Sequence, residues 1–126
     1  MPSGNPPHKR HRTGRASDEQ RVEMVARAIA GNSHFELSTV EMHEDGYSYT
    51  YRTLEQLNHA NPDVEYYFII GADSLFNLDS WMKPERICAA CTMVVATRNH
   101  TSVSKINSEM ARLAKNTRAN SPDWTL

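Results

Sequence analysis

Four stretches of the sequence combine residue types and positions that suit ligand chemistry. In FIIGADSL, an apolar run ends at Gly71, and Asp73 follows two residues later. Glycine permits a close approach between backbone and ligand, and a carboxylate accepts hydrogen bonds from a ribose diol or a metal-bound water. Asp73 or Ser74 would serve equally well as a cap for the next helix, so both roles stay open.

The second stretch, DSWMKP, holds Trp81 in a polar, proline-bounded loop ten residues after Gly71. An indole in such a loop suits stacking on a flat heteroaromatic ring. Its alternative role is that of a core anchor that covers the sheet.

The third stretch, GYSYTYRTL, places Ser48 and Thr50 at the start of a predicted helix. Free amide groups and the positive end of the helix dipole suit a small carboxylate there. Simple N-capping by the same hydroxyls is the alternative.

The fourth stretch is PPHKRHR, near the N-terminus. His8 and Lys9 suit phosphate oxygens, and the adjacent prolines would stiffen the loop that presents them. Alternatively, the stretch is a solvated terminus. Arg98, at the end of TMVVATR, would add a phosphate contact or be an ordinary surface charge.

The elements that must position these stretches follow from hydrophobic periodicity and helix signals. Ser17 and Gln20 form a capping-box pattern before the first helix. A continuous apolar run such as VEYYFII indicates a strand buried on both faces, and therefore a parallel sheet covered by helices. We expect an α/β fold with strands over 34–43, 64–70 and 92–98, a helix from Ser48 or Thr50 to residue 60, a short irregular helix through Trp81, a helix from Pro84, and a last helix over 105–115.

Composition sets further bounds. The 126 residues carry a net charge of −1, so no global basic field attracts nucleic acid, although four cations and no acid precede Asp18. No apolar stretch reaches the roughly 18 residues of a membrane helix and no signal peptide is evident, which predicts a cytoplasmic protein.

Cys88 and Cys91 are interpreted as structural thiols. The chain lacks G-x-G-x-x-G, Walker A and nucleophile-elbow motifs, which argues against dehydrogenases, P-loop enzymes and serine hydrolases.

Taken in order, PPHK, SYTYRTL, IIGADSL, the tryptophan and VVATR resemble the bacterial nicotinate-nucleotide adenylyltransferase family from Met1 to about Arg98. The resemblance implies a Rossmann-like nucleotidyltransferase fold that joins nicotinate mononucleotide to the AMP moiety of ATP, with Mg²⁺, and releases pyrophosphate. It implies one partial domain over 1–126, with a phosphate-binding loop over 1–16 and an irregular tail over 117–126. It also assigns roles by matching position: phosphate contacts for His8, Lys9 and Arg98, the nicotinate carboxylate for Tyr49 and Thr50, ribose for Gly71 and Asp73, and the pyridine ring for Trp81 and the Met82 amide.

Two family segments have no counterpart in the printed sequence. One is a first strand with a G-G-T-F-D-P-x-H-x-G-H loop whose histidines stabilise the triphosphate, and the other is a later I-S-S-T-x-I-R stretch. We therefore expect this chain to be catalytically impaired, because lost transition-state donors cost rate. A missing central strand would also favour self-association.

Two other functions stay open. One is a non-catalytic nucleotide-binding module that keeps the mononucleotide pocket. The other is a basic arm over residues 8–15 for nucleic acid, against which the net charge of −1 argues.

Overall fold

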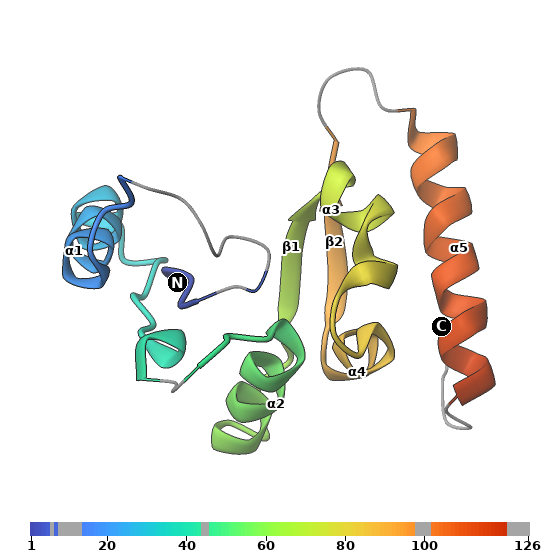
Figure 1. Cartoon of the computed structure of the whole chain (residues 1–126), viewed down its shortest axis with the longest axis horizontal. Helices are drawn as coiled ribbons and strands as arrows, with labels where there is room; N and C mark the ends of the chain where they lie inside the picture. The colour runs from blue at the N-terminus through green and yellow to red at the C-terminus, as the bar shows by residue number, and fades with distance from the viewer. Residues whose placement is uncertain (6, 8–13, 44–45, 98–101, 121–126) are drawn as a thin grey trace. The chain divides into compact units, whose positions relative to one another are not determined.

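The computed structural model divides the chain into two compact units, Met1–Thr53 and Leu54–Leu126. It describes residues 1–5, 7, 14–43, 46–97 and 102–120 (Figure 1). The first unit holds α1 and η2, the second holds the sheet with its helices, and α2 contains the boundary between the units.

Helix α1 (Asp18–Ile29) begins as the sequence predicts. The Ser17 side chain accepts a hydrogen bond from the Gln20 amide, and the Gln20 side chain accepts one from the Ser17 amide. This reciprocal pair satisfies two amide groups that the first helical turn leaves without partners. Gly31 follows the helix with a φ of 83°, a conformation that glycine adopts without a Cβ penalty.

The strand predicted over 34–43 is wrong. Residues 34–39 form no regular element, and η2 (Val40–His43) is a short 3-10 helix. The backbone turns because local groups take up its hydrogen bonds: the Asn32 side chain accepts from the His34 amide at 3.0 Å, and the Met42 amide donates to the Thr39 carbonyl at 2.8 Å. Such local bonds compete with a strand ladder, which hydrophobic alternation alone does not reveal.

Helix α2 (Thr50–Ala60) confirms the predicted helix and its end before Asn61-Pro62-Asp63. Its last turns contact α4 (Pro84–Ala90) in the second unit. Asn58 donates to the Ala90 carbonyl at 2.7 Å, and Arg86 pairs with Glu55 at 2.6 Å. A helix that begins with proline, as α4 does, was also expected from the sequence.

The sheet of the second unit consists of β1 (Tyr67–Gly71) and β2 (Thr92–Ala96), which run parallel. Their register pairs Ile69 with Val94 and Gly71 with Ala96. The connection between them contains α3 (Ala72–Phe76), η3 (Leu78–Ser80) and α4. The expected α/β class with a parallel sheet is therefore confirmed.

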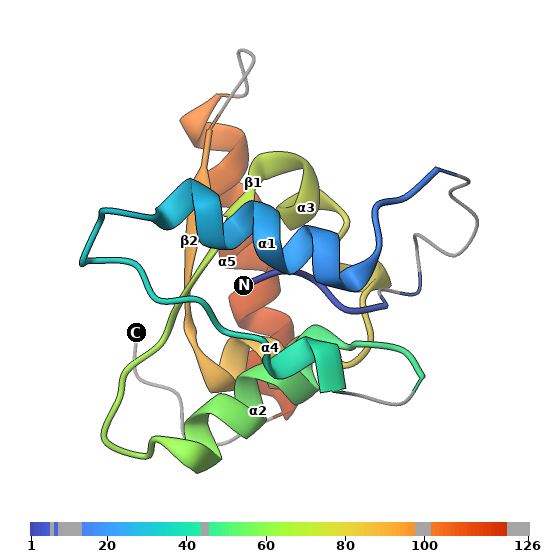
Figure 2. The ribbon, with the colours of Figure 1, turned by 90° about the vertical axis from the view of Figure 1, so that its left-hand side faces the viewer.

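The core of this unit lies between the sheet and its helices. Its fully buried side chains come from α3, η3 and α4, namely Leu75, Leu78 and Ile87. Figures 1 and 2 show α5 (Val103–Asn120) on one side of the two strands. On β1, Tyr67 and Ile69 are 59% and 71% exposed, so the predicted burial on both faces is wrong, because alternate residues of a strand point to opposite faces.

Helix α5 begins two residues earlier than predicted and ends at Asn120, so residues 117–120 are helical and the predicted irregular tail is wrong there. Pro122 is the first strong helix breaker in this part of the sequence, and proline disfavours helical geometry at the residue that precedes it. The rest of the predicted tail, 121–126, lies outside the described residues. Within the described ranges, no helix has the length and apolarity that crossing a bilayer requires.

We predict that Ile87→Val lowers the free energy of unfolding by about 1 kcal/mol, since it removes one methylene group from a fully buried site. Chemical denaturation measures this loss. Val103→Ala, at a position 63% exposed, serves as the control and should change stability by less than about 0.5 kcal/mol. Equal effects of the two substitutions would contradict the assigned core.

Candidate functional site

In the second unit, Gly71 links β1 to α3 and stands at the N-cap of that helix, where no side chain caps the amides. The predicted alternative of a cap at Asp73 or Ser74 is therefore wrong, because both residues lie inside the helix. A Cβ at Gly71 would meet the Asp73 Oδ1 atom at 3.2 Å, so the carboxylate lies close to the end of the strand. Asp73 is exposed, and its carbonyl accepts a hydrogen bond from the Asn77 side chain at 2.9 Å.

Trp81 and Met82 form the turn between η3 and α4. Trp81 is half-buried and its amide donates to the Leu78 carbonyl at 3.0 Å, whereas Met82 is 48% exposed. The next residue, Lys83, has φ 51° and ψ 60°, and among the described residues no other non-glycine has a positive φ. A left-handed lysine before proline is unfavourable and needs support from its surroundings. The backbone beside Trp81 is therefore held in a specific strained turn.

An ion-pair group joins η3 to α5 just before this turn. Arg112 donates to Asp79 at 2.5 Å and also pairs with Glu109. The hydrogen bond from Arg112 lowers the pKa of Glu109, and the two carboxylates raise the pKa of Arg112. Since the Arg112 and Asp79 side chains are about half exposed, their ion pair is expected to add little to stability.

In the first unit, Thr50 is the first residue of α2. The Tyr49 carbonyl accepts from the amides of Arg52 and Thr53 at 3.1 and 3.2 Å, so the Thr50 amide before them has no partner inside the helix. The Tyr49 ring stacks on that of Tyr51, with 6.1 Å between centroids. The Arg52 guanidinium lies over the Tyr49 ring, 5.4 Å from its centroid, so this end of α2 offers a backbone amide and a hydroxyl rather than an open aromatic face.

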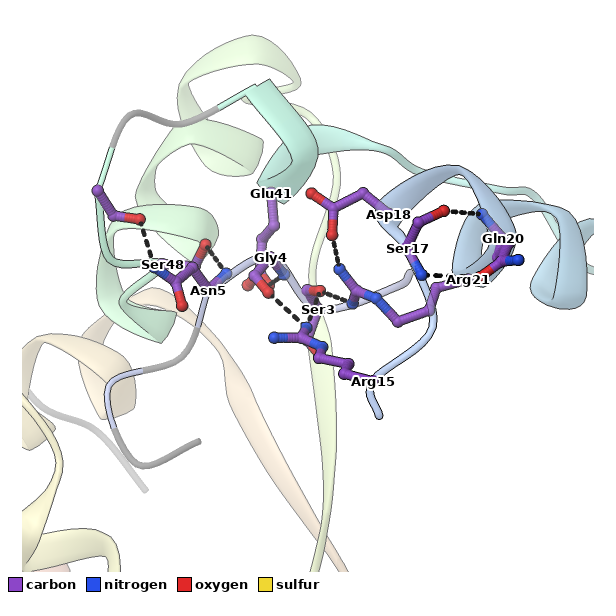
Figure 3. Close-up of polar contacts among 11 residues, drawn as sticks. Ser3, Gly4, Asn5, Arg15, Ser17, Asp18, Gln20, Arg21, Glu41 and Ser48 are labelled. Carbon is purple, nitrogen blue, oxygen red and sulfur yellow. Dashed lines mark hydrogen bonds and ion pairs between the residues drawn. The ribbon is translucent and has the colours of Figure 1, made fainter. Parts of the chain in front are cut away.

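Ser48, the other predicted cap, has a different role. Its hydroxyl accepts from the Asn5 amide and its amide donates to the Asn5 carbonyl, both at 3.0 Å. These bonds belong to a group that we call the N-terminal clamp, which consists of Gly4, Asn5, Arg15, Glu41 and Ser48 (Figure 3). Glu41 accepts from the Gly4 amide at 2.9 Å, and Arg15 donates to the Gly4 carbonyl at 2.8 Å.

Sequence reasoning missed the clamp. The available signal was a charged residue, Glu41, inside a stretch otherwise assigned to a strand, and a glycine, Gly4, outside any predicted turn. A charged side chain that interrupts an apolar pattern often has a specific partner.

The predicted site residues thus fall into three groups. The first unit contains Tyr49 and Thr50, and the second contains Gly71, Asp73, Trp81 and Met82. The remaining three, His8, Lys9 and Arg98, lie outside the described residues.

The two cysteines lie on and just after α4 and form no disulfide bond. Cys91 donates to the Ile87 carbonyl at 3.3 Å. Burial, together with the neighbouring Cys88, raises the pKa of Cys91 to about 11. A high pKa keeps a thiol protonated and unreactive, which supports a structural role. In the part of the chain that the structure describes, no group of three or more His, Cys, Asp or Glu side chains could hold a metal ion.

Comparisons with known proteins bear on the same residues. A family model described as cytidylyltransferase-like matches residues 1–121. The chain is 40% identical over 115 residues to a probable nicotinate-nucleotide adenylyltransferase of Clostridium acetobutylicum, a match that covers 91% of this chain and 57% of that protein. It is 41% identical to a protein of the same description from Rubrobacter xylanophilus, with 90% and 53% covered. The chain therefore spans about half the length of the curated relatives it matches.

We predict that Cys91 in the folded chain reacts about 100 times more slowly with iodoacetamide at about pH 8 than in the urea-unfolded chain, because its pKa is raised to about 11. Peptide mapping by mass spectrometry follows the two cysteines separately. Cys88→Ser removes one of the two causes of the raised pKa, so the protection of Cys91 from iodoacetamide should decrease. Equal rates in the folded and unfolded chain would exclude the structural role.

Proposed function

The chain belongs to the cytidylyltransferase-like family, and from this premise we propose that it acts in the adenylylation of nicotinate mononucleotide. In this reaction ATP supplies AMP, and the products are deamido-NAD and pyrophosphate. The observation that carries the proposal is the similarity to nicotinate-nucleotide adenylyltransferases over 91% of the chain. A cytoplasmic location and a tendency to self-associate are parts of the same proposal.

The nicotinate end of the substrate has proposed contacts in each unit, taken from the family resemblance residue by residue. The Thr50 hydroxyl and amide, with the backbone at Tyr49, would hold the carboxylate, since a helix N-terminus favours an anion. Trp81 would stack on the pyridine ring with the Met82 amide nearby. Its half-buried indole supports this role, because one part remains accessible.

The ribose and phosphate end would meet the carboxyl end of β1 and the basic residues. Asp73 is exposed beside Gly71, where a carboxylate accepts hydrogen bonds from the ribose hydroxyls. Ligands in open α/β sheets bind beyond the carboxyl ends of the strands, which supports this placement. The side chains of His8, Lys9 and Arg98 would donate hydrogen bonds to phosphate oxygens.

The chemistry needs no protein nucleophile. A phosphate oxygen of nicotinate mononucleotide forms a bond to the α-phosphorus of ATP, the bond to the β-phosphate oxygen breaks, and pyrophosphate leaves with the electron pair. Positioning and charge neutralisation carry such transfers. Mg²⁺ would be held mainly by the phosphates of ATP, as is usual for this ion.

A second candidate is a non-catalytic module that binds the mononucleotide alone. The described site residues favour it in one respect, because all six of them are assigned to the mononucleotide and none to ATP. Binding without turnover separates the two functions. A polypeptide of these 126 residues that bound nicotinate mononucleotide and released pyrophosphate from ATP at a rate typical of enzymes would exclude the module.

We predict that the chain binds nicotinate mononucleotide and that Asp73→Asn and Trp81→Ala each weaken binding about tenfold, through a lost charged hydrogen bond and a lost stacking contact. Isothermal titration calorimetry measures the dissociation constants. Asp63→Asn, an exposed change of the same chemistry, is the matched control and should leave binding unchanged. If neither Asp73→Asn nor Trp81→Ala changed the affinity, the proposed pocket would be wrong.

A further inference from the structure

The carboxylate of Glu41 joins two segments that lie far apart in the sequence. One oxygen accepts from the Gly4 amide, and the other accepts from the Thr53 hydroxyl, both at 2.9 Å. Both partners are donors, so an acceptor-only group with two oxygens fits them. Hydrogen bonds to a charged acceptor are roughly twice as strong as neutral ones. Glu41 is therefore well placed to fix Gly4 relative to the first turns of α2.

The contact at Gly4 leaves no room for a side chain. A Cβ at this position would lie 2.1 Å from the Ser48 hydroxyl and 2.3 Å from the Glu41 carbonyl oxygen. Gly4 and Ser48 are buried, and Thr53 is only 2% exposed. The segment of Gly4 and Asn5 is thus packed directly against the residues around the start of α2 (Figure 3).

The clamp also joins residues that lie on either side of PPHKRHR (6–12) in the sequence. Gly4 and Asn5 precede this stretch, and Arg15, which follows it, donates to the Gly4 carbonyl at 2.8 Å. In the sequence, His8 follows Asn5 by three residues. At the other side of Glu41, Thr53 approaches the Tyr49 carbonyl at 3.4 Å, one turn from Thr50.

We propose that Glu41 is a positioning residue for mononucleotide binding: its bonds to Gly4 and Thr53 hold the segment of Gly4 and Asn5, which precedes His8 and Lys9 in the sequence, against the start of α2. This inference rests on the proposed function, in which His8 and Lys9 meet the phosphate and the start of α2 meets the nicotinate carboxylate. Glu41 itself touches neither group. It reduces the entropy lost when one ligand must engage both segments.

The test compares Glu41→Ala, Glu41→Gln and Glu36→Ala in the full chain. Glu41→Ala loses both bonds. Glu41→Gln retains them in neutral form, because its oxygen accepts from Gly4 while its amide donates to the Thr53 hydroxyl. Glu36→Ala removes an exposed carboxylate of the same unit and serves as the control. Amide hydrogen exchange at Gly4 and Asn5 should become about tenfold faster in Glu41→Ala alone, with α1 unchanged.

Calorimetry then measures affinity for nicotinate mononucleotide and for nicotinate riboside, which lacks the phosphate. In Glu41→Ala the advantage of the mononucleotide over the riboside should fall about tenfold, with rescue by Glu41→Gln. A purely structural role would weaken both ligands equally and overturn the proposal, as would an unchanged ratio. Failure of the unmodified chain to bind the mononucleotide would instead refute the proposed function, and the positioning role with it.

Gly4→Ala provides an independent variant that leaves the Glu41 side chain intact. Its methyl group cannot fit against Ser48 and Glu41, so the clamp must shift. The proposal predicts the same loss of discrimination between mononucleotide and riboside as in Glu41→Ala. Normal discrimination in a folded Gly4→Ala chain would overturn it.

Discussion

The parallel pairing of β1 with β2 is the constraint on which the second unit depends. Parallel strands cannot be joined by a tight turn, so the chain must pass over the sheet between Gly71 and Thr92. That passage contains α3, η3 and α4, and it supplies the fully buried side chains of the core. It also starts at Gly71 and includes Trp81. The same crossover therefore builds the core and presents the residues proposed to contact ribose and pyridine.

The first unit is stabilised in a different way. Its helix α1 contains no buried residue, and the clamp instead relies on directional polar contacts around a close approach at Gly4. Buried polar groups are costly unless each finds a partner, so such a network strongly favours one arrangement of its segments. A ligand that must meet several separate groups benefits from that type of order more than from additional apolar burial.

Much of this architecture could be predicted from local sequence signals. The capping box at Ser17, the proline at the start of α4 and the apolar runs of both strands each act over a few residues, and the structure confirms these elements. The exposed face of β1 could not be predicted, because an apolar run does not say whether a second layer covers it. The clamp could not be predicted either, since its bonds join residues 37 and 43 positions apart.

The wrongly predicted strand and the clamp involve the same stretch of the chain. Apolar residues around Leu37 and Met42 suggest alternation, yet the same stretch carries Glu41, whose two oxygens need donors. In the structure these donors come from Gly4 and Thr53, and the backbone turns into η2 to bring the carboxylate to them. Long-range bonds to Glu41 thus act together with the local bonds at Asn32 and Thr39 against the apolar pattern. Conflicts of this kind between levels of structure are expected at functional sites, which is why the failed strand prediction points to Glu41.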